Sequence, residues 1–420
     1  MSIKRLQNTL QQLNEFGYSD KGMNRLAYSD EEQAALEYLM NEMTKEGMSV
    51  HRDAIGNVIA RREGANSDLP AVAFGSHIDT VYNGGQYDGS VGVIAGLEVV
   101  RMLNDEEVET KHPIELIIFA CEESARFGVA TIGSKVMTGN IQVEELWTLK
   151  DKDNISFEEA LKARNLDIHS ISQAERPQDS IKVFYELHVE QGKVLEFERK
   201  QVGVVSGIAA PTRFEITIRG QAAHSGATPM WLRQDAFLGA AELALEIEKA
   251  GYLEEAKGTV ATVGYCEVSP GAMNVIPGEV TLQVDIRSID QPSKDYVVHR
   301  MMSKISKIQK NRDLTIDYKE LCDEAPVKLE GEIIASLQES CEQLHVSYVE
   351  MPSGAGHDAM NMAKRFPTGM IFVPSKDGIS HNKDEYTSME QIMDGLKVLK
   401  EEILKTAEVT SLCLARGESK

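Results

Sequence analysis

Residues 112–123 read HPIELIIFACEE, a nearly continuous apolar run that ends in two adjacent glutamates. A strand with so few polar residues is expected where both faces of a sheet are covered, as in parallel sheets. Two further segments have the same character, LPAVAFGSH and MIFVPS. Between LPAVAFGSH and HPIELIIFACEE lies SVGVIAGLEVVRMLNDE, which has helical periodicity and small residues that allow close packing on a sheet. Strands that alternate with helices in this way predict an α/β fold built on a mixed sheet.

The pattern changes at about residue 208. RFEITIRG and EVTLQVDIRS alternate apolar and polar residues, which indicates strands with one solvated face. A long helix, QDAFLGAAELALEIEKAG, lies between them. With 420 residues the chain exceeds the size at which one hydrophobic core keeps growing. We therefore predict a smaller α+β domain over 208–326, inserted into a first domain made of 1–207 and 327–420.

Composition narrows the classes of partner and location. The net charge of -22 repels nucleic acids and anionic membranes, so neither is expected as a partner. No apolar run reaches the roughly 20 residues that span a bilayer, and the first residues lack the apolar core of a signal peptide. The cysteines are odd in number and form no CxxC pair, which predicts reduced thiols in a cytoplasmic protein. They are Cys121, Cys266, Cys322, Cys341 and Cys413.

Side chains that can bind metal follow the predicted strands. The stretches are GSHIDTVYNGGQYDG, ACEESARFG, YELHVEQG and GISHNKDEYT, and they contain His77, Asp88, Glu122, Glu123, His188 and His381. In open α/β sheets, ligands bind at the carboxyl ends of the strands, so these residues could converge. Nitrogen and oxygen donors without thiolate suit zinc, manganese or cobalt. The alternative for each histidine is a hydrogen-bonded structural role at a strand–loop junction.

Glu122 and Glu123 are the most unusual pair. Burying two adjacent carboxylates is costly unless a cation offsets their charge, although both could instead be solvated at the strand end. Adjacent residues of a strand point to opposite sides, so one glutamate could bind a metal while the other faces a water molecule. A Lewis acid beside a general base is the arrangement needed for metal-assisted hydrolysis.

Taken together, the motifs resemble a known family. HIDTV with YDG, CEE, ELHVEQG, HSGATPM, SGAGHDA and GISHN are similar to the metal-dependent amidohydrolases of the hydantoinase/carbamoylase group. This group includes N-carbamoyl-L-amino acid hydrolases, β-ureidopropionases and allantoate amidohydrolases. It is related to the aminoacylase and carboxypeptidase G type metallopeptidases. The resemblance extends from GMNRLAYSDEE to GISHNKDEYT and implies a metallopeptidase-like catalytic domain with an inserted lid and dimerisation domain.

The resemblance also implies a centre of two divalent ions, either zinc, manganese or cobalt. One ion would be held by His77, Asp88 and His188. The other would be held by Asp88, Glu123 and His381, so that Asp88 bridges the two. Asp79 would orient His77 through the second ring nitrogen, with a turn-capping role as the alternative. Glu122 would be the general base that takes a proton from the attacking water.

The residues that contact the substrate follow from the same resemblance. His224 would stabilise the oxyanion of the tetrahedral intermediate. Arg287 would bind a substrate carboxylate, with Asn274 as a further donor. Gln191 would contact the ureido or carboxylate group, and His357 is a matched position that could bind substrate or shape its loop. Because some of these groups cross a subunit interface in relatives, a homodimer is expected.

The predicted reaction is hydrolysis of the carbamoyl C–N bond of an N-carbamoyl-L-amino acid, a small ureido acid. The close alternative is an allantoate amidohydrolase, since allantoate is also an α-ureido acid. A peptidase or aminoacylase is a third possibility. A non-catalytic binding protein with the same fold is a fourth, but a binding module has no need of a base such as Glu122.

Overall fold

The computed structural model describes residues 3–412, and the chain divides into two compact units. The first comprises the described residues of Met1–Ser206, Leu329–Met351 and His357–Lys420. The second comprises Gly207–Lys328 and the short segment Pro352–Gly356, which the sequence analysis had left in the first domain. The lid and dimerisation role of the second unit stays a prediction.

The first unit is built on a twisted sheet with strand order β9-β18-β8-β5-β7-β4-β3, and β17 pairs with β9. The four central strands β18, β8, β5 and β7 run parallel, whereas β9, β4 and β3 join them antiparallel. This mixed sheet confirms the predicted fold class. The strands are β3 (Ser49–Arg52), β4 (Val58–Arg62), β5 (Ala71–His77), β7 (Ile114–Phe119), β8 (Ile181–Val189), β9 (Val202–Ile208), β17 (Tyr348–Ser353) and β18 (Thr368–Val373).

The longer helices of this unit pack with the sheet into one large core. They are α1 (Ile3–Asn14), α2 (Asp30–Lys45), α3 (Ser90–Asp105), α10 (Gly331–Gln343) and α12 (Met389–Ala407). A second core lies under α4 (Ile132–Met137), α6 (Phe157–Lys162) and η1 (Ile168–Ala174). The remaining short elements are β1 (Tyr18–Ser19), β2 (Gly22–Met23), β6 (Val108–Thr110), α5 (Val143–Leu146), α7 (Val194–Glu198), α11 (Asp358–Met362), η4 (Lys376–Gly378) and β19 (Val409–Leu412).

Local sequence explains where these elements begin. The Ser29 side chain caps α2 by accepting a hydrogen bond from the backbone of Glu32, and Ser388 forms a reciprocal capping box with Gln391 at α12. Every residue of β5 and of β7 is buried, as expected for strands covered on both faces. The apolar run that ends in Glu122 is therefore a central strand.

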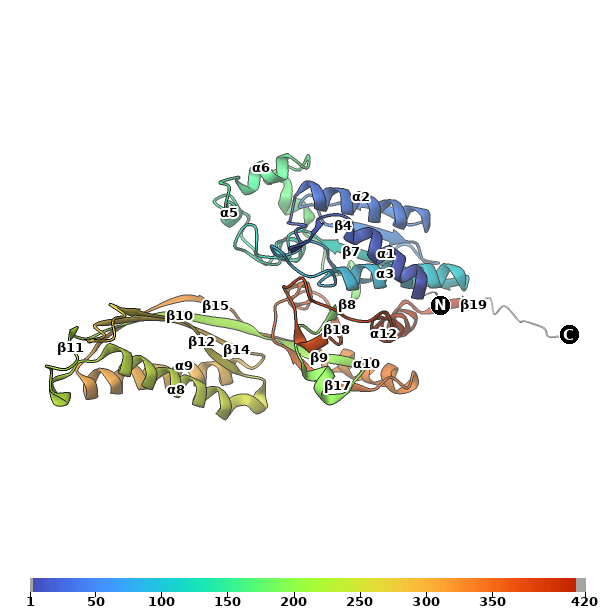
Figure 1. The fold of residues 1–420 in the computed structure, drawn as a ribbon. Helices are drawn as coiled ribbons and strands as arrows, with labels where there is room; N and C mark the ends of the chain where they lie inside the picture. Colours follow the sequence, from blue (N-terminus) through green and yellow to red (C-terminus); the bar gives the residue numbers. More distant parts are fainter. Residues whose placement is uncertain (1–2, 413–420) are drawn as a thin grey trace. The chain divides into compact units, whose positions relative to one another are not determined.

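The second unit is a four-stranded antiparallel sheet, in the order β12-β14-β10-β15. Helices α8 and α9 lie side by side on one face of it (Figure 1) and enclose a separate core. The elements are β10 (Ala210–Arg219), β11 (Ala223–His224), η2 (Met230–Leu232), α8 (Ala236–Glu254), η3 (Glu255–Lys257), β12 (Val260–Ser269), β13 (Val275–Ile276), β14 (Glu279–Ser288), α9 (Gln291–Arg312), β15 (Thr315–Asp323) and β16 (Val327–Lys328).

The sequence analysis identified β10, α8 and β14 in this unit but not α9. That helix is largely polar, and its buried stripe consists of residues three or four apart, Val297, Met301, Ile305 and Ile308. Strands β12 and β15 were missed because most of their side chains are exposed, which hides the alternation of a half-buried strand.

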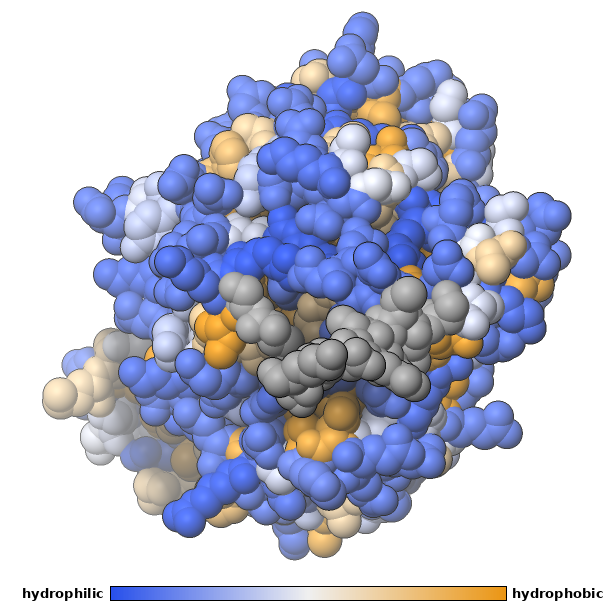
Figure 2. All heavy atoms as spheres, turned by 90° about the vertical axis from the view of Figure 1, so that its right-hand side faces the viewer, coloured by the Kyte–Doolittle hydropathy of each residue, from blue (hydrophilic) through white to orange (hydrophobic). Residues whose placement is uncertain are grey.

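The surface agrees with the composition. The face drawn in Figure 2 is mainly hydrophilic, with hydrophobic residues scattered in small groups. Among the described helices, none is long and apolar enough to cross a membrane. The four described cysteines are free thiols, whereas Cys413 lies outside the described residues. The cytoplasmic location stays a prediction.

Candidate metal centre

The predicted metal ligands of the first unit meet at one edge of its sheet. His77 is the last residue of β5, His188 is next to last in β8, and Glu122 and Glu123 closely follow β7. Because β5, β7 and β8 are parallel, their carboxyl ends lie at the same edge. Two loops complete the group. One precedes α3 and contributes Asp88, and the other lies between η4 and α12 and contributes His381.

One group of three ligands consists of His77, Asp88 and His188, all buried, with donor atoms within 4.8 Å of one another. The His188 Nε2 atom lies 3.1 Å from Asp88 Oδ1, and the His77 Nε2 atom lies 3.9 Å from the same oxygen. Two imidazole nitrogens and one carboxylate oxygen are a suitable donor set for a divalent transition metal ion.

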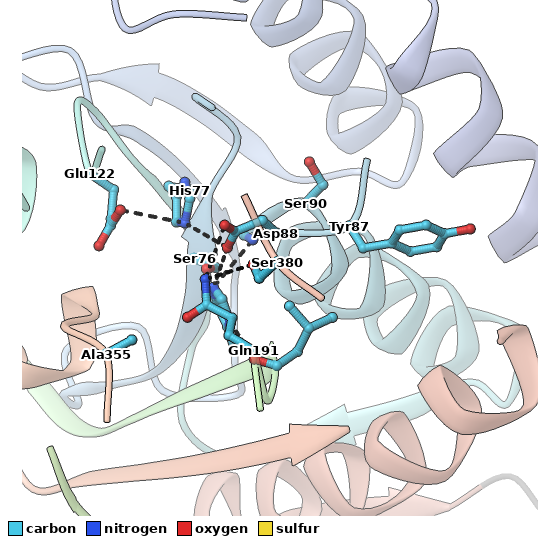
Figure 3. A network of polar contacts seen from close by, with 12 residues as sticks. Ser76, His77, Tyr87, Asp88, Ser90, Glu122, Gln191, Ala355 and Ser380 are labelled. Carbon is cyan, nitrogen blue, oxygen red and sulfur yellow. Dashed lines mark hydrogen bonds and ion pairs between the residues drawn. The ribbon is translucent and has the colours of Figure 1, made fainter. Parts of the chain in front are cut away.

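The second group consists of Asp88, Glu123 and His381, again within 4.8 Å. Here the His381 Nε2 atom lies 3.1 Å from Asp88 Oδ2 and 3.3 Å from Glu123 Oε1. The two carboxylate oxygens of Asp88 therefore face different histidines, which is the geometry required of a bridging ligand. Figure 3 shows Asp88 at the centre of this network, with Glu122 directed toward His77.

Hydrogen bonds orient the two buried histidines. The Nδ1 atom of His77 lies 2.9 Å from the backbone oxygen of Asp79, and that of His188 lies 2.8 Å from the backbone oxygen of Val189. In a neutral ring, Nδ1 donates to these carbonyls and Nε2 is left as the electron-pair donor. Both Nε2 atoms face Asp88.

Asp79 has a second role that the sequence analysis missed. Its Oδ1 and Oδ2 atoms accept hydrogen bonds from the backbone N–H groups of Glu122 and Glu123, at 3.1 and 3.0 Å. The carboxylate is 3.5 Å from His77 Nδ1, farther than the backbone oxygen of Asp79. Asp79 thus positions the glutamate pair through its carboxylate and the histidine through its backbone oxygen.

Two backbone conformations bring the ligands together. Gly89 has a φ of 60°, and a Cβ atom at this position would lie 2.5 Å from the His77 ring. The YDG motif therefore needs glycine directly after Asp88. Cys121 also adopts a positive φ, 53°, at the point where the chain turns out of β7 toward the glutamates.

Burial dominates the electrostatics of the glutamate pair. It raises the pKa of Glu122 well above its usual range; the nearby charge of His77 opposes this effect and that of Glu123 adds to it. The pKa of Glu123 is raised by burial as well. Ionising these carboxylates together is unfavourable without a cation. The donor atoms and their burial both fit a divalent metal site.

Gln191 and His357 lie next to the ligand groups. The Gln191 Nε2 atom donates to Asp88 Oδ2 at 3.1 Å and to Ser380 Oγ at 3.2 Å. The ring of His357 is buried, and its centroid lies 4.5 Å from the centroid of the His188 ring. Burial and the charge of His188 lower the pKa of His357 well below its usual range, so its ring is neutral. His357 also belongs to a third possible ligand group, with Glu186 and His188.

Sequence reasoning missed several buried polar residues around the centre. Arg25 is fully buried, and its guanidinium donates to the backbone oxygen of Ile78 at 2.7 Å and to Ser90 Oγ at 2.9 Å. Glu186 accepts from Ser76 Oγ at 2.7 Å, and Glu385 contacts the Asp88 loop. Arg25 lies in the GMNRLAYSDEE motif, but the composition of this motif does not reveal that the arginine is buried.

The second unit contains the remaining predicted site residues, and two of them are neighbours. His224 is the last residue of β11 and pairs with Val275 of β13. The backbone N–H of Ser225 donates to the backbone oxygen of Asn274 at 3.0 Å. The Nδ1 atom of His224 accepts from the N–H groups of Gly226 and Ala227, at 3.0 and 3.2 Å. In the neutral ring the proton is therefore on Nε2, which makes that atom a hydrogen-bond donor.

Arg287 is distant from this pair. It lies near the end of the ten-residue strand β14, whose first residue, Glu279, closely follows β13, the pairing partner of the strand that ends in His224. A strand of this length is roughly 30 Å long. The guanidinium of Arg287 pairs with Asp285 at 3.1 Å and donates to the backbone oxygen of Gly354 at 2.9 Å. His224, in the two-stranded sheet of β11 and β13, and Arg287 thus lie near opposite ends of β14.

Comparisons with known proteins agree with this architecture. The profile of the Peptidase family M20/M25/M40 matches residues 73–405. An uncharacterized hydrolase of Haemophilus influenzae is 44% identical over 409 residues, covering 97% of this chain and 99% of that protein. The N-carbamoyl-L-amino acid amidohydrolase of Geobacillus stearothermophilus is 40% identical over 409 residues, covering 96% and 98%.

Other relatives have different names. The ureidoglycolate hydrolase of Arabidopsis thaliana is 37% identical, covering 94% of this chain and 84% of that protein. The allantoate amidohydrolase of Escherichia coli is 34% identical, covering 94% and 95%. The crystal structure of a hydantoinase/carbamoylase family amidase from Burkholderia multivorans has a TM-score of 0.91 and 36% identity, covering 97% and 98%.

The chain belongs to the Peptidase family M20/M25/M40, whose members are metal-dependent. Its relatives confirm the predicted resemblance to the hydantoinase/carbamoylase group. It is a hydrolase that acts on non-peptide C–N bonds.

Replacing Asp79 with alanine tests the support of the glutamate pair. The variant leaves the buried N–H groups of Glu122 and Glu123 without their acceptor, which costs about 1–3 kcal/mol for each group. We expect the free energy of unfolding in urea to fall by roughly 2–6 kcal/mol. The exposed Asp68 is the control, since Asp68→Ala should change stability by less than about 0.5 kcal/mol. Equal stability of the two variants would contradict the assigned role.

Proposed function

We propose that this protein hydrolyses the carbamoyl C–N bond of an N-carbamoyl-L-amino acid, giving the amino acid, ammonia and carbon dioxide. The observation that supports this most directly is the arrangement of Asp88, whose two oxygens face two separate groups of ligands. The carbamoylase relative from Geobacillus stearothermophilus supports the choice of substrate. Allantoate is the second candidate, supported by the relative from Escherichia coli.

In this proposal the chain holds two divalent ions, one in each ligand group. Ions held there would supply Lewis-acid chemistry: they would polarise the ureido carbonyl and lower the pKa of a water molecule. The residues determine where this chemistry occurs. His77 and His188 present Nε2 atoms because carbonyl groups hold their Nδ1 atoms, and Asp88 spans the two groups.

Glu122 is the proposed general base. Its Oε2 atom lies 3.7 Å from His77 Nε2, so the carboxylate borders the ligand group while Asp79 fixes its backbone. Burial raises the pKa of the Glu122 carboxyl, and a higher pKa makes its carboxylate a stronger base toward water. Among the described residues, Glu123 belongs to one of the ligand groups and Glu122 to none.

The substrate contacts proposed for the second unit require two copies of the chain. His224 donates from Nε2 to the oxyanion, Asn274 adds a donor, and Arg287 binds the carboxylate. A small ureido acid cannot contact groups near both ends of a strand roughly 30 Å long. We therefore propose that the pair His224 and Asn274 and the residue Arg287 act in different sites, one of which belongs to a partner subunit.

The expected homodimer can be tested by sedimentation. In the second unit, α8 and the neighbouring edge strand β12 expose apolar side chains, namely Leu245, Tyr252, Leu253 and Val260. We expect the protein to sediment as a dimer and Leu245→Arg to sediment as a monomer with little activity, because charge disfavours an apolar interface. The control is Phe197→Arg, at an exposed apolar residue of the first unit, which should remain dimeric. A fully active monomer would contradict the shared site.

Arg287→Ala tests recognition of the substrate carboxylate. Losing a charge-assisted contact should raise KM by about 10- to 100-fold with a smaller effect on kcat. Arg213→Ala is a matched control, because Arg213 lies on the adjacent strand and pairs with the same Asp285 at 3.2 Å. If both variants raise KM equally, Arg287 is not a specific carboxylate contact.

The reaction itself is tested by ammonia release. We expect the metal-loaded protein to release ammonia from N-carbamoyl-L-methionine with a higher kcat/KM than from allantoate or ureidoglycolate, and a chelator to abolish the activity. A higher kcat/KM for allantoate would favour the second candidate. Release of amino acid from a dipeptide, without ammonia from any ureido acid, would contradict both.

Glu122→Gln is the control for this assay. It keeps the shape of the side chain but cannot accept the proton, so kcat should fall at least ~100-fold while metal content is unchanged. A near-normal rate in this variant would rule out Glu122 as the base.

A further inference from the structure

Glu385 connects the two loops that supply Asp88 and His381. Its Oε2 atom accepts hydrogen bonds from the backbone N–H groups of Tyr87 and Asp88, both at 3.0 Å. Its Oε1 atom accepts from Ser380 Oγ at 2.8 Å. Almost 300 residues separate the two loops in sequence, and this single carboxylate contacts both.

The loop that contains His381 needs such an anchor. Residues 381–384 are exposed, and the His381 side chain itself is 50% exposed. Glu385 follows directly and is only 4% exposed. Glu385 is thus a buried residue that connects the exposed loop of His381 to the loop of Asp88. His77 and His188, in contrast, belong to strands whose positions the sheet already fixes.

The opposite loop is shaped to receive this carboxylate. A Cβ atom at Gly85 would lie 2.0 Å from Glu385 Oε2, so glycine is required for the approach. Ser380, which donates to Glu385, also accepts a hydrogen bond from Gln191 Nε2 at 3.2 Å. Figure 3 shows Ser380 beside Gln191 and Asp88. The hydrogen-bonded path therefore runs from one loop to the other through Glu385.

We propose that Glu385 is a positioning residue that sets the distance between the Asp88 loop and the His381 loop. This inference rests on the two-ion centre of the proposed function. Because His381 belongs only to the group with Asp88 and Glu123, loss of Glu385 weakens that group more than the group with His77 and His188. Glu385 touches neither the ions nor the substrate and acts through the backbone of Asp88 and the side chain of Ser380.

The test is calorimetric titration of the chelator-stripped full chain with manganese chloride, which reports metal affinity without turnover. We expect the wild-type chain to bind two ions. Glu385→Ala should weaken one of them by about 10- to 100-fold, the usual effect of losing a group that orients a ligand, and leave the other within a few-fold. Unchanged affinity for both ions would overturn the proposal.

Two substitutions separate positioning from charge. Glu385→Gln retains an oxygen that accepts from the two N–H groups, and its amide N–H can donate to Ser380 Oγ in place of the hydrogen bond that Oε1 accepts, so it should keep both affinities near wild-type values. Glu385→Asp retains the charge but is one methylene shorter, so it should resemble alanine. If the aspartate variant binds like wild type and the glutamine variant does not, charge rather than geometry is responsible and the proposal fails. The aspartate variant also provides the test if the alanine variant does not fold.

Glu402→Ala is the matched control. Glu402 is also a fully buried carboxylate of the first unit, and it accepts hydrogen bonds from Tyr185 and Ser336 at 3.1 and 2.9 Å. Its loss should lower the thermal midpoint but leave both affinities unchanged, and a selective loss of one ion here would overturn the proposal. A wild-type chain that binds fewer than two ions would instead contradict the two-ion centre of the proposed function.

Discussion

The first unit depends on keeping several carboxylates out of water at one edge of its sheet. Asp88, Glu122 and Glu123 are each at most 7% exposed, and burying like charges together is costly without cations. The chain meets this constraint with histidines whose Nδ1 atoms are held by backbone carbonyls and with N–H groups aimed at Asp79 and Glu385. Each of these features leaves carboxylate oxygens and Nε2 atoms available to a divalent ion.

The second unit has a different physical role. Its main sheet is antiparallel, it has a separate hydrophobic core, and its candidate residues lie near opposite ends of β14. The first unit thus supplies the ligand groups, and the second presents donors at both ends of a long strand. If two chains assemble through α8 and β12, each site can receive His224 from one copy and Arg287 from the other. The reaction then depends on assembly as well as on metal.

Much of the site could be predicted from sequence because its ligands adjoin buried strands. The apolar runs before His77 and Glu122 identify parallel strands, and parallel strands bring their carboxyl ends together. The supporting residues could not be found in this way. Asp79 was expected to orient His77, but its carboxylate also holds the backbone of Glu122 and Glu123. Arg25 and Glu385 act through contacts distant in sequence, which no local pattern reveals. The polar helix α9 was missed because its buried stripe is narrow.

The central claim is that Asp88 bridges two metal ions. Anomalous diffraction from crystals soaked with manganese, recorded near the manganese absorption edge, tests it most directly. The account predicts two peaks, one on each side of the Asp88 carboxylate, with His77 and His188 at one and Glu123 and His381 at the other. A single peak would contradict it, as would a peak among Glu186, His188 and His357, the remaining buried group of possible ligands.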